Sequence, residues 1–340
     1  MQTVLLTGAS GYIAKHIAVQ LLNAGFTVRA SVRNLTRADE VRAAVQPHLN
    51  GPLAERLSFV ALDLEQDAGW DVALQGVDVL MHTASPFPLS QPKDPADLIR
   101  PAVQGALRAL RAAKAAGVKR VILTSSSAAV AGGPLPPGKA AFTEDDWTNP
   151  NAPGTSAYTQ SKTLAERAAW DFVRDTAPQM QLTTINPVLV VGPPLDTTFG
   201  TSVSIIERLL NARDPMIPHF GFATVDVRDV ALAHVLALTT PGTEGRRYIV
   251  ADQFLWFTDI AQILKTNFPT RKIVTRRAPN FVVRLLGLFD KSIASIVPIL
   301  GRRDEVSGAR AQAELGLKFR DARRSVIETA QFLMDQKLVK

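Results

Sequence analysis

Cysteine is absent from the 340 residues of this chain. Its absence excludes disulfide bridges, thiolate nucleophiles and metal sites built on cysteine, and it fits the cytoplasmic setting that we expect. Aromatic residues make up only 6% of the chain, so a large substrate held between stacked rings is not specially indicated. The histidines and acidic residues show no metal-ligand spacing, and we expect no metal.

Long hydrophobic runs are also missing, because no stretch of about 18 uncharged apolar residues occurs. The most apolar late segment, residues 281–300, is interrupted by Arg284, Asp290 and Lys291. We expect it to form buried helices, with contact to a membrane as the alternative. The apolar run at the N-terminus is short and lacks a basic leader, so no signal peptide is expected.

A concentrated basic segment is lacking as well, although the net charge is +7. The lysines and arginines are scattered and form no recognisable nucleic-acid motif, so we expect no nucleic-acid partner. A basic balance also suits a protein whose ligand carries several phosphates. With 46% hydrophobic and 20% charged residues, the composition is typical of a folded globular protein.

The first informative motif is VLLTGASGYIAKHIAVQLL at residues 4–22. An apolar strand passes through a glycine turn into an amphipathic helix, whose N-terminal N–H groups can bind phosphate. Gly8 permits the tight turn, and Gly11 lets the backbone approach a pyrophosphate. Ala14 stands at the third glycine position and is small enough for close packing. The motif predicts a dinucleotide site.

Strand-like and helix-like patterns alternate through the first two thirds of the chain, which predicts an α/β fold with a doubly wound parallel Rossmann sheet. Ligands in such sheets bind at the carboxyl ends of the strands. The pattern weakens after about residue 190, and helical patterns recur around 203–212, 258–267 and 304–336. We expect a smaller, mostly helical substrate lobe interleaved with the nucleotide domain. The expected division gives 1–190 with 222–250 to the nucleotide domain, and 191–221 with 251–340 to the substrate lobe.

Tyr158 and Lys162 lie four residues apart at the start of a predicted helix, so they share one helical face. A lysine ammonium near a phenol lowers the pKa of the phenol and makes it a usable acid or base. A second polar cluster, Thr124 to Ser127, follows the apolar strand VKRVIL. A hydroxyl there can donate to a carbonyl oxygen as negative charge develops on it.

The motifs TGASGYIA, Asp63-Leu64, HTASPFP, TSSS, YTQSK and INPVLVVGP occur in this order along the chain. Together they resemble the extended short-chain dehydrogenases/reductases. The stretches HTASPFP and INPVLVVGP are most similar to the dihydroflavonol reductase, cinnamoyl-CoA reductase and aldehyde/ketone reductase branch. The resemblance implies that Tyr158 protonates a carbonyl oxygen, Ser126 orients it, and Lys162 tunes Tyr158 and binds the ribose. A shift of register by one would replace Ser126 with Ser125 or Ser127.

The expected cofactor-binding residues combine the glycine turn, the strand ends and the residues implied by the resemblance. They are Thr7, Gly8, Ser10, Gly11, Tyr12, Ile13, Arg33, Arg37, Asp63, Leu64, Thr83, Ala84, Ser85, Thr124, Tyr158, Lys162 and Pro187. The expected substrate-binding residues are Phe87, Ser126 and Tyr158. Many members of the family carry an asparagine on the helix before the serine strand. Here PAVQGALRAL has none, which puts a proton relay through that side chain in doubt.

The second strand indicates which nicotinamide is used. An NAD site usually has an acidic residue at the end of this strand. The strand instead ends in Arg33-Asn34, with no acid before Asp39. Arg33 could bind the 2′-phosphate of NADPH with two parallel hydrogen bonds, and Arg37 could add a second positive charge. We therefore expect NADPH.

The sequence favours an NADPH-dependent reductase of an aldehyde or ketone, a small-molecule carbonyl substrate, and a monomer or homodimer. An NAD-dependent nucleotide-sugar epimerase or dehydratase and a hydroxysteroid dehydrogenase remain alternatives on the same scaffold. A third alternative is a non-catalytic NADPH sensor. His82 and His219 could act as bases, but neither has a paired carboxylate in the sequence, so we expect structural roles for them.

Overall fold

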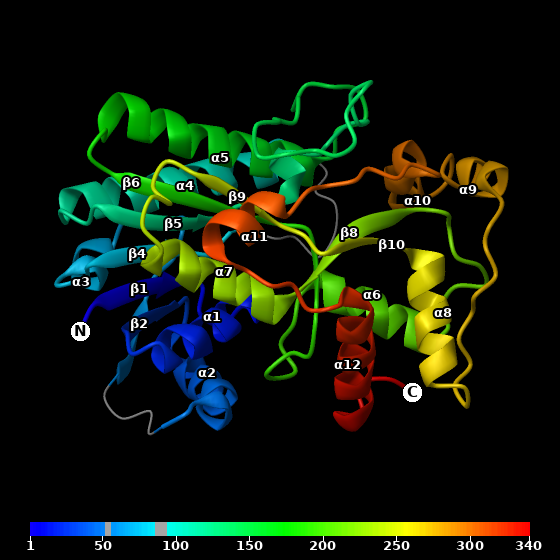
Figure 1. Cartoon of the computed structure of the whole chain (residues 1–340), viewed down its shortest axis with the longest axis horizontal. Coiled ribbons are helices and arrows are strands. Elements are labelled where there is room, and N and C mark those ends of the chain that lie inside the picture. Colours follow the sequence, from blue (N-terminus) through cyan, green and yellow to red (C-terminus); the bar gives the residue numbers. More distant parts are fainter. Residues whose placement is uncertain (52–55, 86–93) are drawn as a thin grey trace.

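The computed structural model describes residues 1–51, 56–85 and 94–340. Its main element is a seven-stranded sheet in which every strand pair is parallel, in the order β3-β2-β1-β4-β5-β6-β9 (Figure 1). The strands are β1 (Thr3–Thr7), β2 (Thr27–Val32), β3 (Leu57–Ala61), β4 (Val79–His82), β5 (Arg120–Thr124), β6 (Gln181–Pro187) and β9 (Arg247–Val250). The predicted doubly wound Rossmann sheet is confirmed.

Helices cover both faces of this sheet because its strands carry apolar side chains on both sides. Leu5 of β1 belongs to the core beneath one helical layer, whereas its neighbour Leu6 belongs to the core beneath the other. The first layer consists of α3 (Trp70–Leu74), α4 (Ala96–Ala115) and α5 (Ala157–Thr176). The second consists of α1 (Tyr12–Asn23), α2 (Ala38–Val45) and α7 (Val227–Thr239).

A second sheet has the order β10-β8-β7 and lies beyond the carboxyl ends of the large sheet (Figure 1). Its strands are β7 (Leu189–Val191), β8 (Gly221–Asp226) and β10 (Gln253–Trp256), of which β10 runs antiparallel to β8. The interval 222–250 spans both parts of the molecule. Its helix α7 packs on α1 and its strand β9 pairs with β6, whereas β8 belongs to the small sheet.

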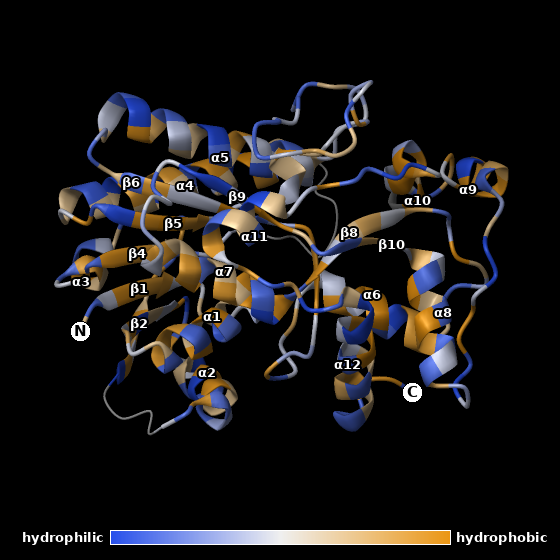
Figure 2. Ribbon diagram, viewed as in Figure 1, coloured by the Kyte–Doolittle hydropathy of each residue, from blue (hydrophilic) through white to orange (hydrophobic). Residues whose placement is uncertain are grey.

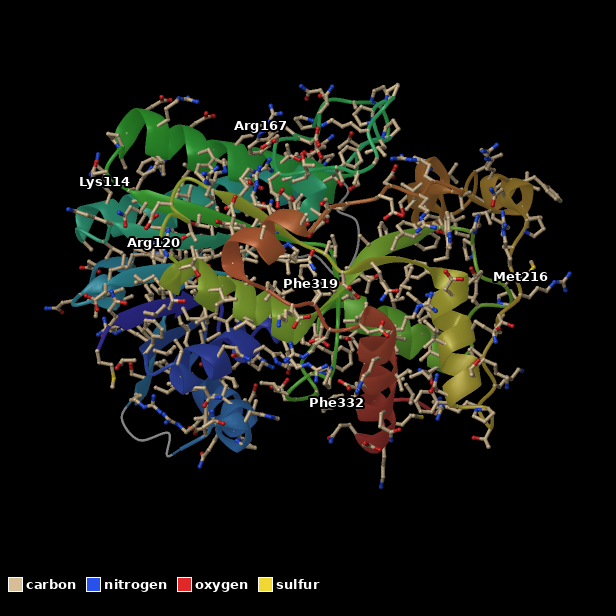
Figure 3. The ribbon with its side chains drawn as sticks, in the orientation of Figure 1. Lys114, Arg120, Arg167, Met216, Phe319 and Phe332 are labelled. Atoms are coloured by element: carbon tan, nitrogen blue, oxygen red, sulfur yellow. The ribbon has the colours of Figure 1, made fainter. Side chains whose placement is uncertain are left out.

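Five further helices surround the small sheet or extend from it: α6 (Thr201–Leu210), α8 (Phe257–Asn267), α9 (Asn280–Leu286), α10 (Lys291–Ile296) and α12 (Ala322–Asp335). Helix α11 (Ala309–Leu315) packs instead on α7 and on β9 of the large sheet. Helix α12 packs on α6 and α8, and Phe319 and Phe332 extend the main core on this side (Figure 3). The helical pattern expected across 304–336 is interrupted, because α11 ends at Gly316 with a left-handed φ of +66°.

Residues 281–300 were expected to form buried helices; they do contain helices, but the expectation of burial is wrong. Helices α9 and α10 are present, but the face that carries Phe281 and Phe289 is exposed to solvent. These helices project from the end of the molecule farthest from the N-terminus (Figures 1 and 2). They therefore have too few neighbours to cover their apolar residues. Within the described residues, none of the helices combines the length and apolar character needed to span a bilayer.

Candidate functional site

The turn between β1 and α1 requires glycine at position 8. Gly8 has a φ of +68°, and a Cβ there would lie 3.0 Å from the Cα of Ala84. Gly11 is the N-cap of α1 and has no side chain that could accept from the first N–H groups of the helix, so these groups are left for a ligand. Ala14 is buried in the core. The residues present therefore fit a diphosphate group, because the backbone is bare where the phosphates would approach.

The end of β4 is joined to this turn by the hydroxyl of Thr7. Thr7 Oγ1 shares a hydrogen bond of 2.8 Å with His82 Nδ1 and accepts the N–H groups of Thr83 and Ala84 at 3.1 and 3.2 Å. Burial lowers the pKa of His82 to about 4, so its ring is neutral near pH 7. His82 thus holds two strand ends together, in agreement with the structural role expected for it.

Arg33 lies just after β2 and is exposed, and it forms no hydrogen bond or ion pair with any other described side chain. Arg37 pairs with Glu40 at 3.0 Å, and its Nη2 lies 3.5 Å from Thr198 Oγ1. Asp63 follows β3, and its carboxylate accepts the N–H of Glu65 at 3.0 Å. The structure thus leaves the Arg33 guanidinium free of described partners at the strand end where a 2′-phosphate was expected.

Tyr158 and Ser126 meet although 32 residues separate them. Tyr158 Oη donates to Ser126 Oγ at 3.3 Å. Ser126 ends the stretch that follows β5, and its hydroxyl also accepts the N–H of Ala128 at 3.1 Å. Ser125 donates instead to Glu166 at 2.5 Å, and Ser127 begins a short 3-10 helix. The geometry therefore favours Ser126 among the three serines.

The sequence predicts that the charge on Lys162 lowers the pKa of Tyr158, but in the structure that pKa is raised. Lys162 Nζ lies 6.0 Å from the centroid of the Tyr158 ring and donates to Ser85 Oγ at 3.0 Å. Burial raises the pKa of Tyr158, and its hydrogen bond with Ser126 opposes that rise. The phenol is consequently protonated near pH 7, the state that a general acid needs. Burial also lowers the pKa of Lys162 to about 8, with the Glu166 carboxylate acting in the opposite direction.

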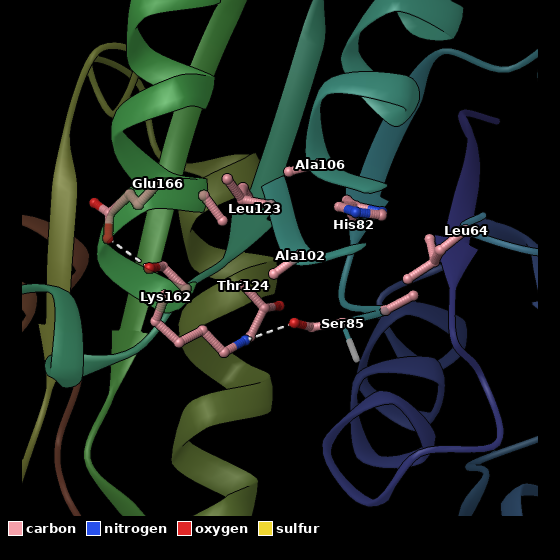
Figure 4. A pocket seen from close by; sticks show the side chains of 12 residues that line it. Leu64, His82, Ser85, Ala102, Ala106, Leu123, Thr124, Lys162 and Glu166 are labelled. Atoms are coloured by element: carbon pink, nitrogen blue, oxygen red, sulfur yellow. Dashed lines mark hydrogen bonds between the residues drawn. The ribbon is translucent and has the colours of Figure 1, made fainter. Parts of the chain in front are cut away.

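A cavity of about 20 Å³ lies beside Lys162, between α4, α5 and the ends of β4 and β5 (Figure 4). Ala102 and Ala106 line it from α4. Their small side chains leave room for about one water molecule, and Lys162 and Ser85 supply polar groups at its wall.

Glu166, which the sequence analysis missed, is 1% exposed and lies one turn after Lys162 on α5. Its carboxylate accepts hydrogen bonds from Ser125 at 2.5 Å, Asn186 Nδ2 at 2.7 Å and Arg247 Nε at 2.7 Å. Asn186 also donates to the carbonyl of Ser126 at 3.2 Å. Glu166 therefore ties the serine strand end to the helix that carries Tyr158. The four-residue spacing from Lys162 was the available signal.

Arg247, at the start of β9, is the partner that makes this buried carboxylate tolerable. Its Nη1 donates to the carbonyls of Glu144 and Asp146, and its guanidinium lies 3.7 Å from the centroid of the Trp147 ring. The network thus joins β9 and the loop around Trp147 to the tyrosine helix. A buried guanidinium cannot be inferred from the sequence EGRRYIV, which presents Arg246 and Arg247 alike.

A second missed contact lies on α1. Tyr12 Oη donates to the carbonyl of Gly192 at 2.7 Å, and the buried Lys15 forms an ion pair with Asp196. Both bonds fix the segment that leaves β7 for the substrate lobe. The Tyr12 side chain is therefore engaged with Gly192, and its contribution to a nucleotide site would come from its backbone in the first turn of α1.

The remaining expected residues are distributed as follows. Ser10 belongs to the glycine turn and Ile13 to the first turn of α1. Leu64 lines the cavity beside Lys162, and Pro187 ends β6. Thr124 Oγ1 shares a hydrogen bond of 2.7 Å with His234 Nε2. Phe87 lies outside the described residues. His219 stacks on Trp256 with ring centroids 4.1 Å apart. Among the described residues, no cluster of three or more potential metal ligands occurs.

Comparison with known proteins adds three relatives. The chain is 36% identical over 342 residues to a cinnamoyl-CoA reductase of Medicago truncatula, covering 98% of this chain and 96% of the other. It is 33% identical to a putative NADPH-dependent methylglyoxal reductase of Candida albicans, over 78% of this chain and 83% of that protein. The solved structure of yeast methylglyoxal/isovaleraldehyde reductase Gre2 complexed with NADPH superposes with a TM-score of 0.81 at 28% identity, covering 99% and 100% of the two chains.

The resemblance deduced from the motifs is confirmed by these relatives. Residues 4–251 match the model described as the NAD dependent epimerase/dehydratase family. That interval begins with the glycine turn and ends after β9, so it contains both Tyr158 and the network around Glu166. This chain belongs to the NAD dependent epimerase/dehydratase family, and its relatives include proteins named as reductases.

Proposed function

We propose that this oxidoreductase uses NADPH to reduce the carbonyl group of an aldehyde or ketone. One observation carries the proposal: the Tyr158 and Ser126 hydroxyls lie 3.3 Å apart at the strand ends, on the side where the glycine turn opens. Two adjacent hydroxyls can both donate to one carbonyl oxygen, since each carries a proton. The reductases among the relatives support this choice of chemistry.

Each residue has a distinct part in the proposed reaction. Ser126 holds the carbonyl oxygen and stabilises the negative charge that develops on it. Tyr158, which its raised pKa keeps protonated near neutral pH, transfers its phenolic proton to the same oxygen. Lys162 Nζ lies 6.0 Å from the centroid of the Tyr158 ring, and it binds the ribose while favouring the phenolate that remains after proton transfer.

NADPH fits the residues present, and when bound it supplies the hydride for the carbonyl carbon. The first turn of α1 would bind the diphosphate and Arg33 the 2′-phosphate, with Arg37 contributing charge beside it. Neither arginine would suit an NAD-retaining epimerase, which needs an acidic residue at this strand end. The NADPH complex of Gre2, at 28% identity, supports the same cofactor.

The experiment is NADPH consumption with a panel of aldehydes, ketones and acyl-CoA thioesters, repeated with Tyr158→Phe. We expect turnover by the wild type and a loss of roughly 10²–10⁴-fold in Tyr158→Phe, with NADPH affinity retained. Tyr248→Phe, which removes a hydroxyl that donates to Glu314 at 2.8 Å, is the matched control. A protein that binds NADPH tightly but consumes none with any carbonyl, whether wild type or variant, would be a sensor instead.

A further inference from the structure

The face formed by α9 and the turn to α10 is unusually apolar for a solvent-exposed surface. Val283 points inward to a small core with Ala278 and Leu300, which Met216 extends (Figure 3). The other large side chains are exposed. They are Phe281 at 73%, Leu285 at 56%, Leu286 at 48%, Leu288 at 77% and Phe289 at 85%. These five are more than half of the exposed large hydrophobic residues found in the described part of the chain.

The same part of the chain is rich in positive charge. Residues 276–291 contain four lysines and arginines and a single acidic residue, Asp290. Arg276, Arg277 and Arg284 are exposed and form no ion pair with a described carboxylate. In contrast, Arg302 and Arg303, which follow, are paired with acidic neighbours. The apolar face is thus bordered by uncompensated positive charge.

We propose that the α9–α10 face docks on an anionic lipid bilayer. Exposed phenylalanine and leucine beside basic side chains are what an interfacial attachment requires, because apolar burial and attraction to acidic headgroups act together. Helices α9 and α10 have seven and six residues, so the attachment is shallow and reaches only the interfacial layer. This inference supports the alternative of membrane contact over the buried helices expected from the sequence.

The position of the face agrees with such docking. Helices α9 and α10 project at the end of the molecule remote from the N-terminus, so a planar surface can approach them (Figures 1 and 2). Behind them, the 3-10 helix Val297–Ile299 approaches the loop that leads into α5, since a Cβ on Gly154 would lie 3.7 Å from Pro298 Cγ. Gly301 N also donates to the carbonyl of His219 at 2.7 Å. The docking face is therefore in contact with the substrate lobe and with the loop before α5.

The test is flotation of the intact protein with vesicles of phosphatidylcholine alone and of phosphatidylcholine with phosphatidylserine. We expect binding to the phosphatidylserine vesicles that weakens as salt is added, since exposed charges are screened. The double variant Phe281→Ser/Phe289→Ser should weaken binding by at least about tenfold, because both side chains lose apolar burial. Val72→Ser, which alters a 63% exposed hydrophobic residue on α3, should bind like the wild type.

Charge and apolar contributions can be separated. Arg276→Ser/Arg277→Ser should reduce binding to phosphatidylserine vesicles by roughly tenfold, whereas Arg246→Ser, an exposed arginine before β9, should not. As a measurement that does not depend on the stability of a double variant, Phe289→Trp should show a blue shift of its fluorescence with these vesicles.

Three results would overturn the proposal. The first is a wild type that fails to float with phosphatidylserine vesicles, and the second is a Phe289→Trp emission that does not move. The third is a wild-type dimer in sedimentation velocity that becomes a monomer in Phe281→Ser/Phe289→Ser, because the face would then be covered by a second copy. None of these readouts depends on the proposed reductase activity.

Discussion

Tyr158 Oη donates to Ser126 Oγ at 3.3 Å, and the two hydroxyls come from different elements, the first turn of α5 and the segment after β5. Their encounter depends on Glu166, which holds Ser125 directly and Ser126 through Asn186. The buried Glu166 carboxylate thus helps to set the distance between the Ser126 and Tyr158 hydroxyls.

Substitution of the serines will test their register. We expect Ser126→Ala to lower kcat by about 10²-fold, because one donor to the developing oxyanion is lost, while NADPH binding is retained. Ser127→Ala is the matched control and should retain nearly full activity. Steady-state kinetics of the two variants measures the difference. Equal losses, or a larger loss in Ser127→Ala, would shift the assignment by one residue.

The role of Arg33 can be tested by cofactor preference. Removing a charge-assisted pair of hydrogen bonds to the 2′-phosphate should weaken NADPH binding by roughly 10–100-fold in Arg33→Ala and leave NADH binding nearly unchanged. Fluorescence titration of both nucleotides measures this ratio. Arg42→Ala, on α2 with its guanidinium 5.4 Å from the Phe59 ring centroid, is the control and should affect neither. Equal weakening of NADPH and NADH would contradict the assignment.

The alkaline limb of the pH profile should report on Lys162. The groups that face it are Glu166 and Tyr158 on α5 and His82 on β4, and the low pKa of His82 keeps that ring neutral throughout. Since burial lowers the pKa of Lys162 to about 8, kcat/KM should fall as the pH rises through this value. Glu166→Gln removes the anion that opposes this shift, so its activity should begin to fall at a lower pH.

Measurement of kcat/KM from about pH 6 to 10 compares the two proteins. Glu144→Gln is the matched control, because Glu144 is also buried but bonds to Ile249 N and not to the residues around Lys162. We expect its alkaline limb to coincide with that of the wild type. An unshifted limb in Glu166→Gln, despite a folded protein, would mean that Glu166 acts only as a structural anchor.

Local patterns in the sequence predicted much of the nucleotide half. The requirement for glycine at position 8 and the shared face of Tyr158 and Lys162 follow from a few consecutive residues, and the alternation of elements dictated the parallel sheet. The solvent exposure of the apolar side chains in residues 281–300 could not be predicted from local patterns. Apolar composition shows that a surface can be buried, but whether other elements reach it depends on how the whole lobe packs.

The network around Glu166 was missed for a related reason. Its members come from the stretch after β5 and from α5, β6 and β9, so no window of sequence contains them together. A glutamate in an amphipathic helix normally faces solvent, and only the presence of Arg247 makes burial acceptable.

The break in the helical pattern at Gly316 was visible in the sequence, because a glycine one residue beyond a helical pattern favours a left-handed end.

The position of Arg247 on β9 determines when the site can form during synthesis and which fragments of the chain can contain it. Strand β9 is the last strand of the large sheet along the chain, and it emerges from the ribosome some 80 residues after Glu166. Until then the carboxylate at the centre of the site lacks its counter-ion, and the edge of β6 is unpaired. A fragment that stops near residue 190 would contain every residue expected to perform chemistry, yet it would not be a portable nucleotide-binding module. The reactive geometry is completed only when the end of the family-matched interval has been made.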